Sequence, residues 1–397
     1  MRIIGLLVLV VVCSAPLGAQ HVYTLGAGID FVGGGDNNPR GGGLTQALRP
    51  PNRMEPFYGA YPSVSFDVVS ARSSLNMGYA YGWNRTDSLV ALLSETHSAS
   101  LTLTNQFSPR WSTSIRESFS RSDDPQTFYA LRGVLPTPEG LTFVFSPVAI
   151  DQTSNSNNIS VDAEHTFDAR SGLSFGGSHN LRNYATDGIR GLSDQQDFGA
   201  NVTFTRRISE RTSWNVGYSG AYYDFSQFNE AISHAARFGM STQLGPNTGL
   251  TWSAGASQVN SRVDSGSFAS YEASAGLQQE IRSNLFQLNY TQDNTTPSGI
   301  GSLSRNRRAS LGFSRALGQS VNVFASASVF DTRAILDNTF DTRGGSATAN
   351  VGFALTRQLS LQVGGQMQRY TKPVTYQFTQ KRVFISLRYS HPNLLRW

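Results

Sequence analysis

The feature that most constrains the fold is a strict alternation of residue types over residues 344–371. Every second residue of 347–355 is apolar, and the residues between them are small or polar. After a short break at 356–358, the same pattern continues over 359–367. A period of two places one set of side chains on each face of a β-strand. Two such arms joined by a tight turn match a hairpin that crosses a bilayer, which needs about 9–11 residues per strand.

The composition suits a wall that separates lipid from water. A chain of 397 residues in which only 39% are hydrophobic is poor in apolar residues for a large packed core. It contains 38 glycines, 24 phenylalanines and 15 tyrosines. A polar lumen, an apolar lipid-facing surface and aromatic belts at the two interfaces account for that mixture. The net charge of +5 and the scattered arginines do not indicate a nucleic-acid partner.

Residues 1–19 have the pattern of a secretory signal peptide. A positive start precedes the apolar run 3–12, which is too short to span a bilayer as a helix, and small residues follow. We therefore expect a signal peptide over 1–19 and an outer-membrane barrel over 20–397. Cys13, the single cysteine, lies inside the signal, so the mature chain is expected to have no disulfide and no cysteine metal site. A lipid anchor on Cys13 is disfavoured because the bulky Val12 precedes it.

Alternating arms recur along the whole mature chain. Tight breaks join the two arms of each hairpin, and from residue 209 onward they recur about every 37 residues, a hairpin-sized period. Counting arms from 22–32 to 377–390 predicts an all-β fold, a single transmembrane antiparallel β-barrel of about eighteen strands. Short periplasmic turns and longer extracellular loops are expected at its two ends. Sixteen strands would follow if the first pair stayed outside the sheet.

The longest interruption of the strand pattern covers residues 122–155. It is not purely polar, because it contains Leu131, Phe143 and Val148 together with several prolines. One interpretation is a folded extracellular loop or an outward extension of the two flanking strands. The other is a loop folded into the lumen as a constriction, where the barrel mouth would cover its apolar groups.

The end of the chain carries a further signal. Apolar residues occupy every second position of 383–389, and the chain ends in Trp397. This pattern resembles outer-membrane β-barrel proteins, whose last strand alternates apolar residues and ends in an aromatic that the insertion machinery reads. Residues 391–393 break the alternation, so either Tyr389 or Trp397 would be that aromatic. In its layout the chain also resembles the large single-chain barrels associated with exopolysaccharide export.

Assigning the apolar face of each arm to lipid assigns the other face to the lumen. Charged residues on that face are expected to line a water-filled lumen, because a cation at the bilayer midplane costs about 2–4 kcal/mol. The candidates are Arg116, Asp162, Glu164, Arg182, Arg207, Arg237, Glu272, Glu280 and Arg308. Arg206 and Arg315 fall on the lipid face near the periplasmic ends, where long side chains reach water. His165 and His179 also fall on the lipid face, and the sequence offers no reason for their position.

Several aromatic residues are expected in the interface belts rather than as stacking platforms for sugars. They are Trp83, Trp214, Tyr222, Tyr223, Trp252 and Tyr370. A polar lumen with charges of both signs, glutamines, asparagines and serines suits neutral polar or mixed-charge solutes. Any water-filled lumen must be polar, however, so each inward charge can equally be a structural brace.

The sequence does not indicate an enzyme. The six histidines are spread singly, and none forms a metal-binding pair with a second histidine or a glutamate at helical spacing. Residues 217–221 resemble a nucleophile elbow only faintly, because the final glycine is missing and the context is mid-strand. No cofactor and no metal site is expected.

The sequence therefore predicts an outer-membrane channel that passes polar solutes or an exported polysaccharide through a hydrated lumen. Its expected partners are outer-membrane lipid, the barrel-insertion machinery, the solute or polysaccharide, and periplasmic export proteins if a polymer is carried. Two other classes stay open: a non-conducting surface or adhesin-like barrel, and a membrane hydrolase with its site at the rim.

Overall fold

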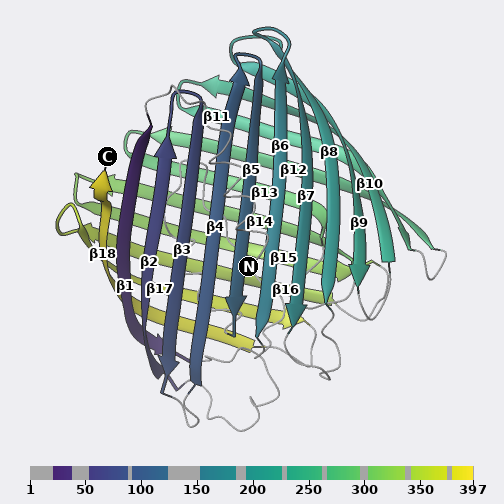
Figure 1. Cartoon of the computed structure of the whole chain (residues 1–397). Helices are drawn as coiled ribbons and strands as arrows, with labels where there is room; N and C mark the ends of the chain where they lie inside the picture. Colours follow the sequence, from purple (N-terminus) through teal and green to yellow (C-terminus); the bar gives the residue numbers. More distant parts are fainter. Residues whose placement is uncertain are drawn as a thin grey trace.

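The computed structural model describes residues 21–37, 53–87, 92–123, 153–184, 194–225, 230–261, 266–295, 303–335, 341–372 and 378–396, and these form one sheet. Figure 1 shows this sheet curved into a barrel, with β1–β9 on the near wall and the later strands crossing behind. The prediction of eighteen strands is confirmed. The strands are β1 (Val22–Asp36), β2 (Glu55–Val69), β3 (Ser73–Thr86), β4 (Leu92–Ser108), β5 (Trp111–Ser122), β6 (Ser154–Thr166), β7 (Ser171–Tyr184), β8 (Gln195–Arg207), β9 (Thr212–Phe225), β10 (Glu230–Gly245), β11 (Thr248–Ser261), β12 (Ser267–Ile281), β13 (Asn284–Thr295), β14 (Ser304–Leu317), β15 (Val321–Ala334), β16 (Asp341–Ala354), β17 (Leu359–Lys372) and β18 (Phe378–Arg396).

The sheet closes because its first strand pairs on both sides. Asp30 of β1 lies opposite Tyr61 of β2 on one side and opposite Arg388 of β18 on the other. Every other strand pairs antiparallel with its neighbours in sequence. A closed sheet leaves no edge strand with unpaired backbone groups, which is the condition for a β-structure to stand in hydrocarbon.

The two ends of the barrel differ as the sequence predicted. Short turns such as 70–72, 246–247 and 282–283 join the strands at one end, which we call the short-turn end. All gaps between the described ranges fall at the opposite end, which we call the loop end. Most of the long interruption, residues 124–152, lies outside the described residues, as does the expected signal peptide.

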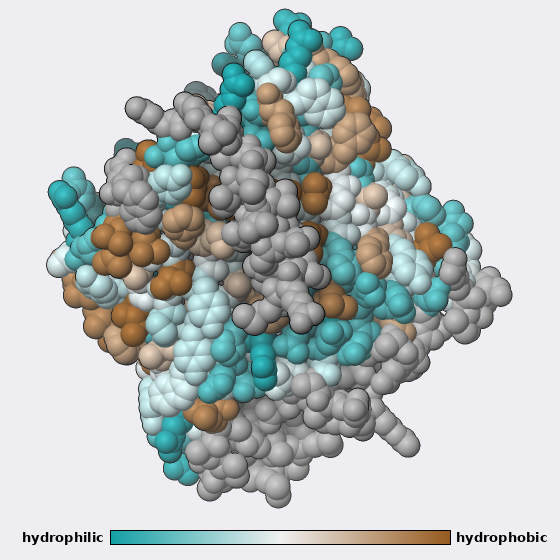
Figure 2. Space-filling view, in the orientation of Figure 1, coloured by the Kyte–Doolittle hydropathy of each residue, from teal (hydrophilic) through white to brown (hydrophobic). Residues whose placement is uncertain are grey.

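The outer wall is apolar. Away from the strand ends, the large hydrophobic side chains that are exposed share one register, with Val64, Leu311, Val329, Val383 and Ile385 among them. Figure 2 shows such apolar residues as brown patches on the visible face. Among the described residues, no helix is long and apolar enough to cross a membrane.

The last strand continues beyond the predicted end. β18 passes through Pro392 and reaches Arg396, because a register shift against β1 absorbs the irregular residues. Leu25 lies opposite Leu395 while Ala27 lies opposite His391. A proline removes one donor from the ladder and is tolerated at such a bulge. Tyr389 points outward and is exposed, and Trp397 lies outside the described residues, so the identity of the terminal aromatic stays a prediction.

The first strand is also longer than predicted. The glycines 33–35 belong to β1 rather than to a loop, and the strand ends at Asp36. A Cβ atom on Gly34 would lie 2.0 Å from the backbone oxygen of Val383 in β18. Only glycine permits so close an approach of the two chains at the point where the barrel closes.

Candidate solute pathway

The inward register of the wall carries the nine charged residues that the sequence proposed for the lumen. Arg237, for example, lies between Gly217 of β9 and Gly255 of β11, and Glu272 lies opposite the same Gly255. The remaining seven share this register on their strands: Arg116, Asp162, Glu164, Arg182, Arg207, Glu280 and Arg308. Their part in solute passage stays a prediction.

One pair of candidates forms an ion pair on an open stretch of the inner wall. Arg116 Nη1 of β5 lies 2.8 Å from Asp162 Oδ2 of β6, and both side chains are about half exposed. The hydroxyl of Ser114 lies 3.4 Å from the same carboxylate oxygen. The exposure indicates that this pair faces space rather than packed protein, as the lining of a hydrated lumen requires.

A second group is more enclosed and spans several strands. Arg237 of β10 donates to the carboxylate of Glu272 on β12, whose side chain is only 7% exposed. Asp293 of β13 interacts electrostatically with Glu272, Arg237 and Arg308. The two carboxylates, Glu272 and Asp293, therefore lie between Arg237 on β10 and Arg308 on β14, so the like charges in the middle of the group have a cation on each side.

The other candidates lie near the barrel ends. Arg182 is close to the loop end of β7, within interaction range of Tyr184. Glu164, Arg207 and Glu280 lie within two residues of the short-turn ends of their strands. The structure therefore does not bring all nine residues into one site but distributes them along the inner wall.

The inner wall also carries an apolar cluster that the sequence analysis missed. Val32, Phe57, Tyr61 and Phe384 come together where β18, β1 and β2 close the barrel. The guanidinium carbon of Arg382 lies 3.8 Å from the centre of the Phe57 ring. A possible signal was the unbroken apolar run 383–385, in which Phe384 interrupts the alternation.

The rings of this cluster lie close against glycines of neighbouring strands. A Cβ atom on Gly82 would lie 2.6 Å from Tyr61 Cδ1, and one on Gly364 would lie 2.8 Å from Phe384 Cζ. The missing side chains thus let bulky rings lie against the wall instead of projecting across the lumen. The rings therefore take up less of the barrel interior than rings that project from the wall would.

Two of the aromatics predicted for the interface belts are misplaced. Tyr223 and Tyr370 lie on the inward register, whereas the other four predicted belt residues lie on the outward register. Tyr370 is 3% exposed, packs edge-on against Phe330 and accepts a 2.6 Å hydrogen bond from Gln368. The prediction failed because these residues were assigned to the belts by residue type, although the alternation along their strands places them on the inward register.

A hollow of about 410 Å³ lies along the wall formed by β1–β6. Small inward side chains line much of it, among them Ser63, Ser98, Ser100 and Ser120, and Arg388 borders it. Hydroxyls donate and accept, so this surface can exchange hydrogen bonds with polar solutes of either type. The hollow therefore offers a polar surface on the inner wall.

The unexplained outward histidines have aromatic partners. His165 is one residue from the end of β6, and its ring centre lies 4.4 Å from that of Trp111 and 4.8 Å from that of Phe167. His179 stacks on Phe198 at 4.5 Å. These contacts indicate structural roles at the aromatic belts. The described residues contain no group of three or more potential metal ligands.

Comparison with known proteins supports the architecture. No protein-family model matches the sequence, and no curated protein does. Among solved structures, OccK7 (OpdD) from Pseudomonas aeruginosa matches over 94% of this chain and 99% of its own, at 11% identity and a TM-score of 0.50. OccK2 (OpdF) from P. aeruginosa, solved with glucuronate, matches over 94% and 97%, at 10% identity and a TM-score of 0.48. OccAB4 from Acinetobacter baumannii matches over 94% and 98%, at 9% identity and a TM-score of 0.48.

Likenesses at this level of identity show the fold alone. The closed sheet and its apolar outer surface agree with that fold, because a wall of this kind is stable only with lipid outside and water inside. The chain is an integral outer-membrane β-barrel with the fold of porin-like proteins.

Proposed function

We propose that this protein is a channel for small polar solutes. The observation that carries the proposal is the contrast between the two registers of one wall. The outward register holds the exposed large hydrophobics, and the inward register holds serines, glycines, amides and paired charges. Water in the lumen solvates a polar inner wall, and a hydrated lumen passes solutes that fit it.

The balance of inward charge favours cations over anions. Acidic residues outnumber arginines on the inward register of the described strands. The acids are Asp30, Asp36, Glu55, Asp67, Asp162, Glu164, Asp197, Glu272, Glu280 and Asp293, and the arginines are Arg116, Arg182, Arg207, Arg237, Arg308, Arg382 and Arg388. Because most of the arginines have acidic neighbours, the selectivity is expected to be weak, and neutral or zwitterionic solutes fit best.

The test is reconstitution of the folded protein into planar lipid bilayers. Discrete conductance steps are expected, with a reversal potential in a KCl gradient on the side of weak cation preference. Ser100→Trp places a large ring in the serine-lined hollow and is expected to lower the single-channel conductance. Ala99→Trp, one position away on the outward register, is the matched control and should leave it unchanged. Folded protein that never conducts would contradict the proposal.

Swelling of vesicles in sugars and amino acids of increasing size would then define the solutes. The sequence analysis also allowed an exported polysaccharide, a non-conducting surface barrel and a rim hydrolase. No observation on the described strands favours any of these three over small-solute passage. Residues 217–221, the faint nucleophile elbow, lie in the middle of β9 as an ordinary strand.

A further inference from the structure

A row of charged side chains crosses the outer wall near the loop end. Arg307 of β14 lies opposite Asp331 of β15, which lies opposite Arg343 of β16. Arg369 of β17 lies opposite Gly345, two positions from Arg343. All four residues occupy the outward register, within three residues of the loop ends of their strands. We call Arg307, Asp331, Arg343 and Arg369 the basic row.

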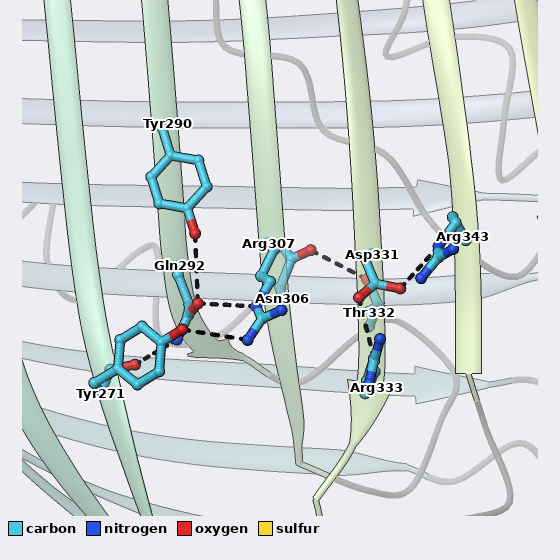
Figure 3. Close-up of polar contacts among 9 residues, drawn as sticks. All are labelled: Tyr271, Tyr290, Gln292, Asn306, Arg307, Asp331, Thr332, Arg333 and Arg343. Atoms are coloured by element: carbon cyan, nitrogen blue, oxygen red, sulfur yellow. Dashed lines mark hydrogen bonds and ion pairs between the residues drawn. The ribbon is translucent and has the colours of Figure 1, made fainter.

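The charges of the basic row do not cancel. Asp331 already has two arginines, because Arg333 Nε lies 3.1 Å and Arg343 Nε 3.3 Å from its carboxylate oxygens (Figure 3). Both guanidinium groups are about half exposed. Arg369 is exposed and has no ion pair within the described part of the chain. The row therefore presents excess positive charge to whatever lies outside the barrel at this height.

Neutral partners hold Arg307 in place. Its Nε donates to Gln292 Oε1 at 2.9 Å and its Nη2 to the Tyr271 hydroxyl at 3.3 Å, while Gln292 donates to the Tyr271 backbone oxygen at 2.8 Å. Tyr290 donates to the same Gln292 oxygen at 3.4 Å (Figure 3). Gln292 is 1% exposed, so this support is built into the wall. It orients the guanidinium without neutralising it.

An apolar groove begins at the basic row and continues toward the middle of the wall. Its volume is about 830 Å³, and it covers the outer face of β13–β17. Ala309, Ala327, Gly345 and Ala347 form a shallow floor, with larger side chains such as Leu288 and Met367 at its sides. A groove on this register faces hydrocarbon, and small residues leave room for an acyl chain.

We propose that the groove and the basic row bind a phosphate-bearing, multiply acylated lipid of the leaflet at the loop end. Arg307, Arg343 and Arg369 would hold the phosphate, for which planar guanidinium groups are well suited, and an acyl chain would lie over the alanine floor. Arginine on an outer wall is tolerated near the interface, at about 0–1 kcal/mol, but not at the midplane. A second copy of this chain is disfavoured as the occupant, because two such rows would repel each other. The proposal does not depend on whether the lumen conducts.

Native mass spectrometry of the folded protein in neutral detergent tests this proposal, with bisphosphorylated lipid A as the probe. The wild type is expected to retain the lipid. Arg307→Gln combined with Arg369→Gln leaves Asp331 with both its partners and is expected to weaken binding about thirtyfold, which is about fivefold per arginine. Arg315→Gln, which removes an outward arginine of β14 at the short-turn end, is the matched control and should bind as the wild type does.

A second variant tests the groove separately from the charge. Ala327→Trp fills the floor without changing any charge, and it is expected to weaken lipid A binding by at least several-fold. The heat-dependent gel mobility of each variant confirms that it is folded, and phosphatidylcholine serves as the lipid without net charge. Equal binding of lipid A by the wild type and the double variant, or an equal loss in Arg315→Gln, would overturn the proposal. Unchanged binding in Ala327→Trp would overturn the role of the groove, and a dimer without lipid would point to a second copy instead.

Discussion

Charged side chains are distributed differently on the inner and outer faces of this wall. On the inner face, charged side chains occur at many heights and have partners of opposite sign, as in Arg116 with Asp162 and Arg237 with Glu272. On the outer face, arginines gather near the strand ends, where Arg333 and Arg343 share the single carboxylate of Asp331. Water solvates a charge anywhere along its path, whereas lipid accepts one only at headgroup level.

One outward residue departs from this rule. Glu117 lies opposite Leu101 on the outward register, away from the ends of β5, and is 9% exposed. The Nδ2 group of Asn157 on β6 donates to its carboxylate at 3.3 Å. The neighbouring outward side chains cover it, so the carboxyl group of Glu117 has little direct contact with lipid.

The largest difference between the two faces is expected in the cost of placing a charge on each of them. Leu311→Arg puts a cation on the outward register in the middle of β14, and we expect it to lower the free energy of unfolding by about 2–4 kcal/mol. Ser310→Arg, the adjacent inward position, is expected to cost about 1 kcal/mol or less, because the guanidinium remains in water. Urea unfolding in lipid vesicles measures both. Equal costs at the two positions would show that the faces have been assigned wrongly.

The next largest effect is expected on the inner face at Gly82, which lies beneath the ring of Tyr61. Gly82→Val would clash with Tyr61, so we expect a loss of about 1–3 kcal/mol in unfolding free energy or displacement of the ring into the lumen with lower conductance. Gly312→Val is the control, because a Cβ atom there has ordinary contacts 3.7 Å from Gln287. If the two variants unfold at the same urea concentration and conduct equally, the packing of Tyr61 on Gly82 does not matter.

The two inward ion pairs should respond differently to loss of their arginine. Arg237→Gln leaves the enclosed carboxylate of Glu272 with a weaker partner, and a cost of about 1–3 kcal/mol in unfolding free energy is expected. Arg116→Gln breaks an exposed pair and should cost about 0–1 kcal/mol. In planar-bilayer recordings with a KCl gradient, both variants should shift the reversal potential in the direction of stronger cation selectivity. A stability loss as large in Arg116→Gln as in Arg237→Gln would mean that the Arg116–Asp162 pair is not in water.

The smallest effect on stability is expected in a turn at the short-turn end, away from both faces of the wall. In the β6–β7 connection, the Ser171 hydroxyl and then the backbone N–H of Arg170 donate to Asp168 and hold the pKa of that carboxyl below its usual range. The stabilisation is therefore present above the unfolded pKa of about 4 and is lost as the pH falls through the lower folded value. Asp168→Asn should be slightly less stable than the wild type at pH 7. The difference in urea midpoint should shrink in acid, and a constant difference would argue against the carboxylate as its cause.

Periodicity was sufficient to predict most of the fold. The alternation in 347–355 and 359–367 gave both the strands and their outward faces, because a side chain's register follows from its neighbours in one strand. The course of β18 through Pro392 was not predictable in this way, since it depends on pairing with β1, which lies at the other end of the sequence.

The candidate site was less predictable than the fold. The inward register of Arg116 or Glu272 followed from alternation, but their partners on other strands did not, because pairing depends on the stagger between strands. Phe384 and Tyr370 were missed as inward residues because apolar residues were assigned to lipid. The basic row was missed because its residues come together only through the pairing of β14 to β17, which the alternation within one strand does not give.

The central claim is that water fills the inner side of the wall and lipid covers the outer side. Cys13 is the single cysteine, so single-cysteine variants along β14 in a Cys13→Ser background can be labelled in vesicles with a membrane-impermeant thiol reagent. Cysteines at Ser310, Gly312 and Ser314 should react quickly, and those at Ala309, Leu311 and Phe313 should be protected. Labelling at the same rate at all six positions, or the reverse alternation, would contradict this account.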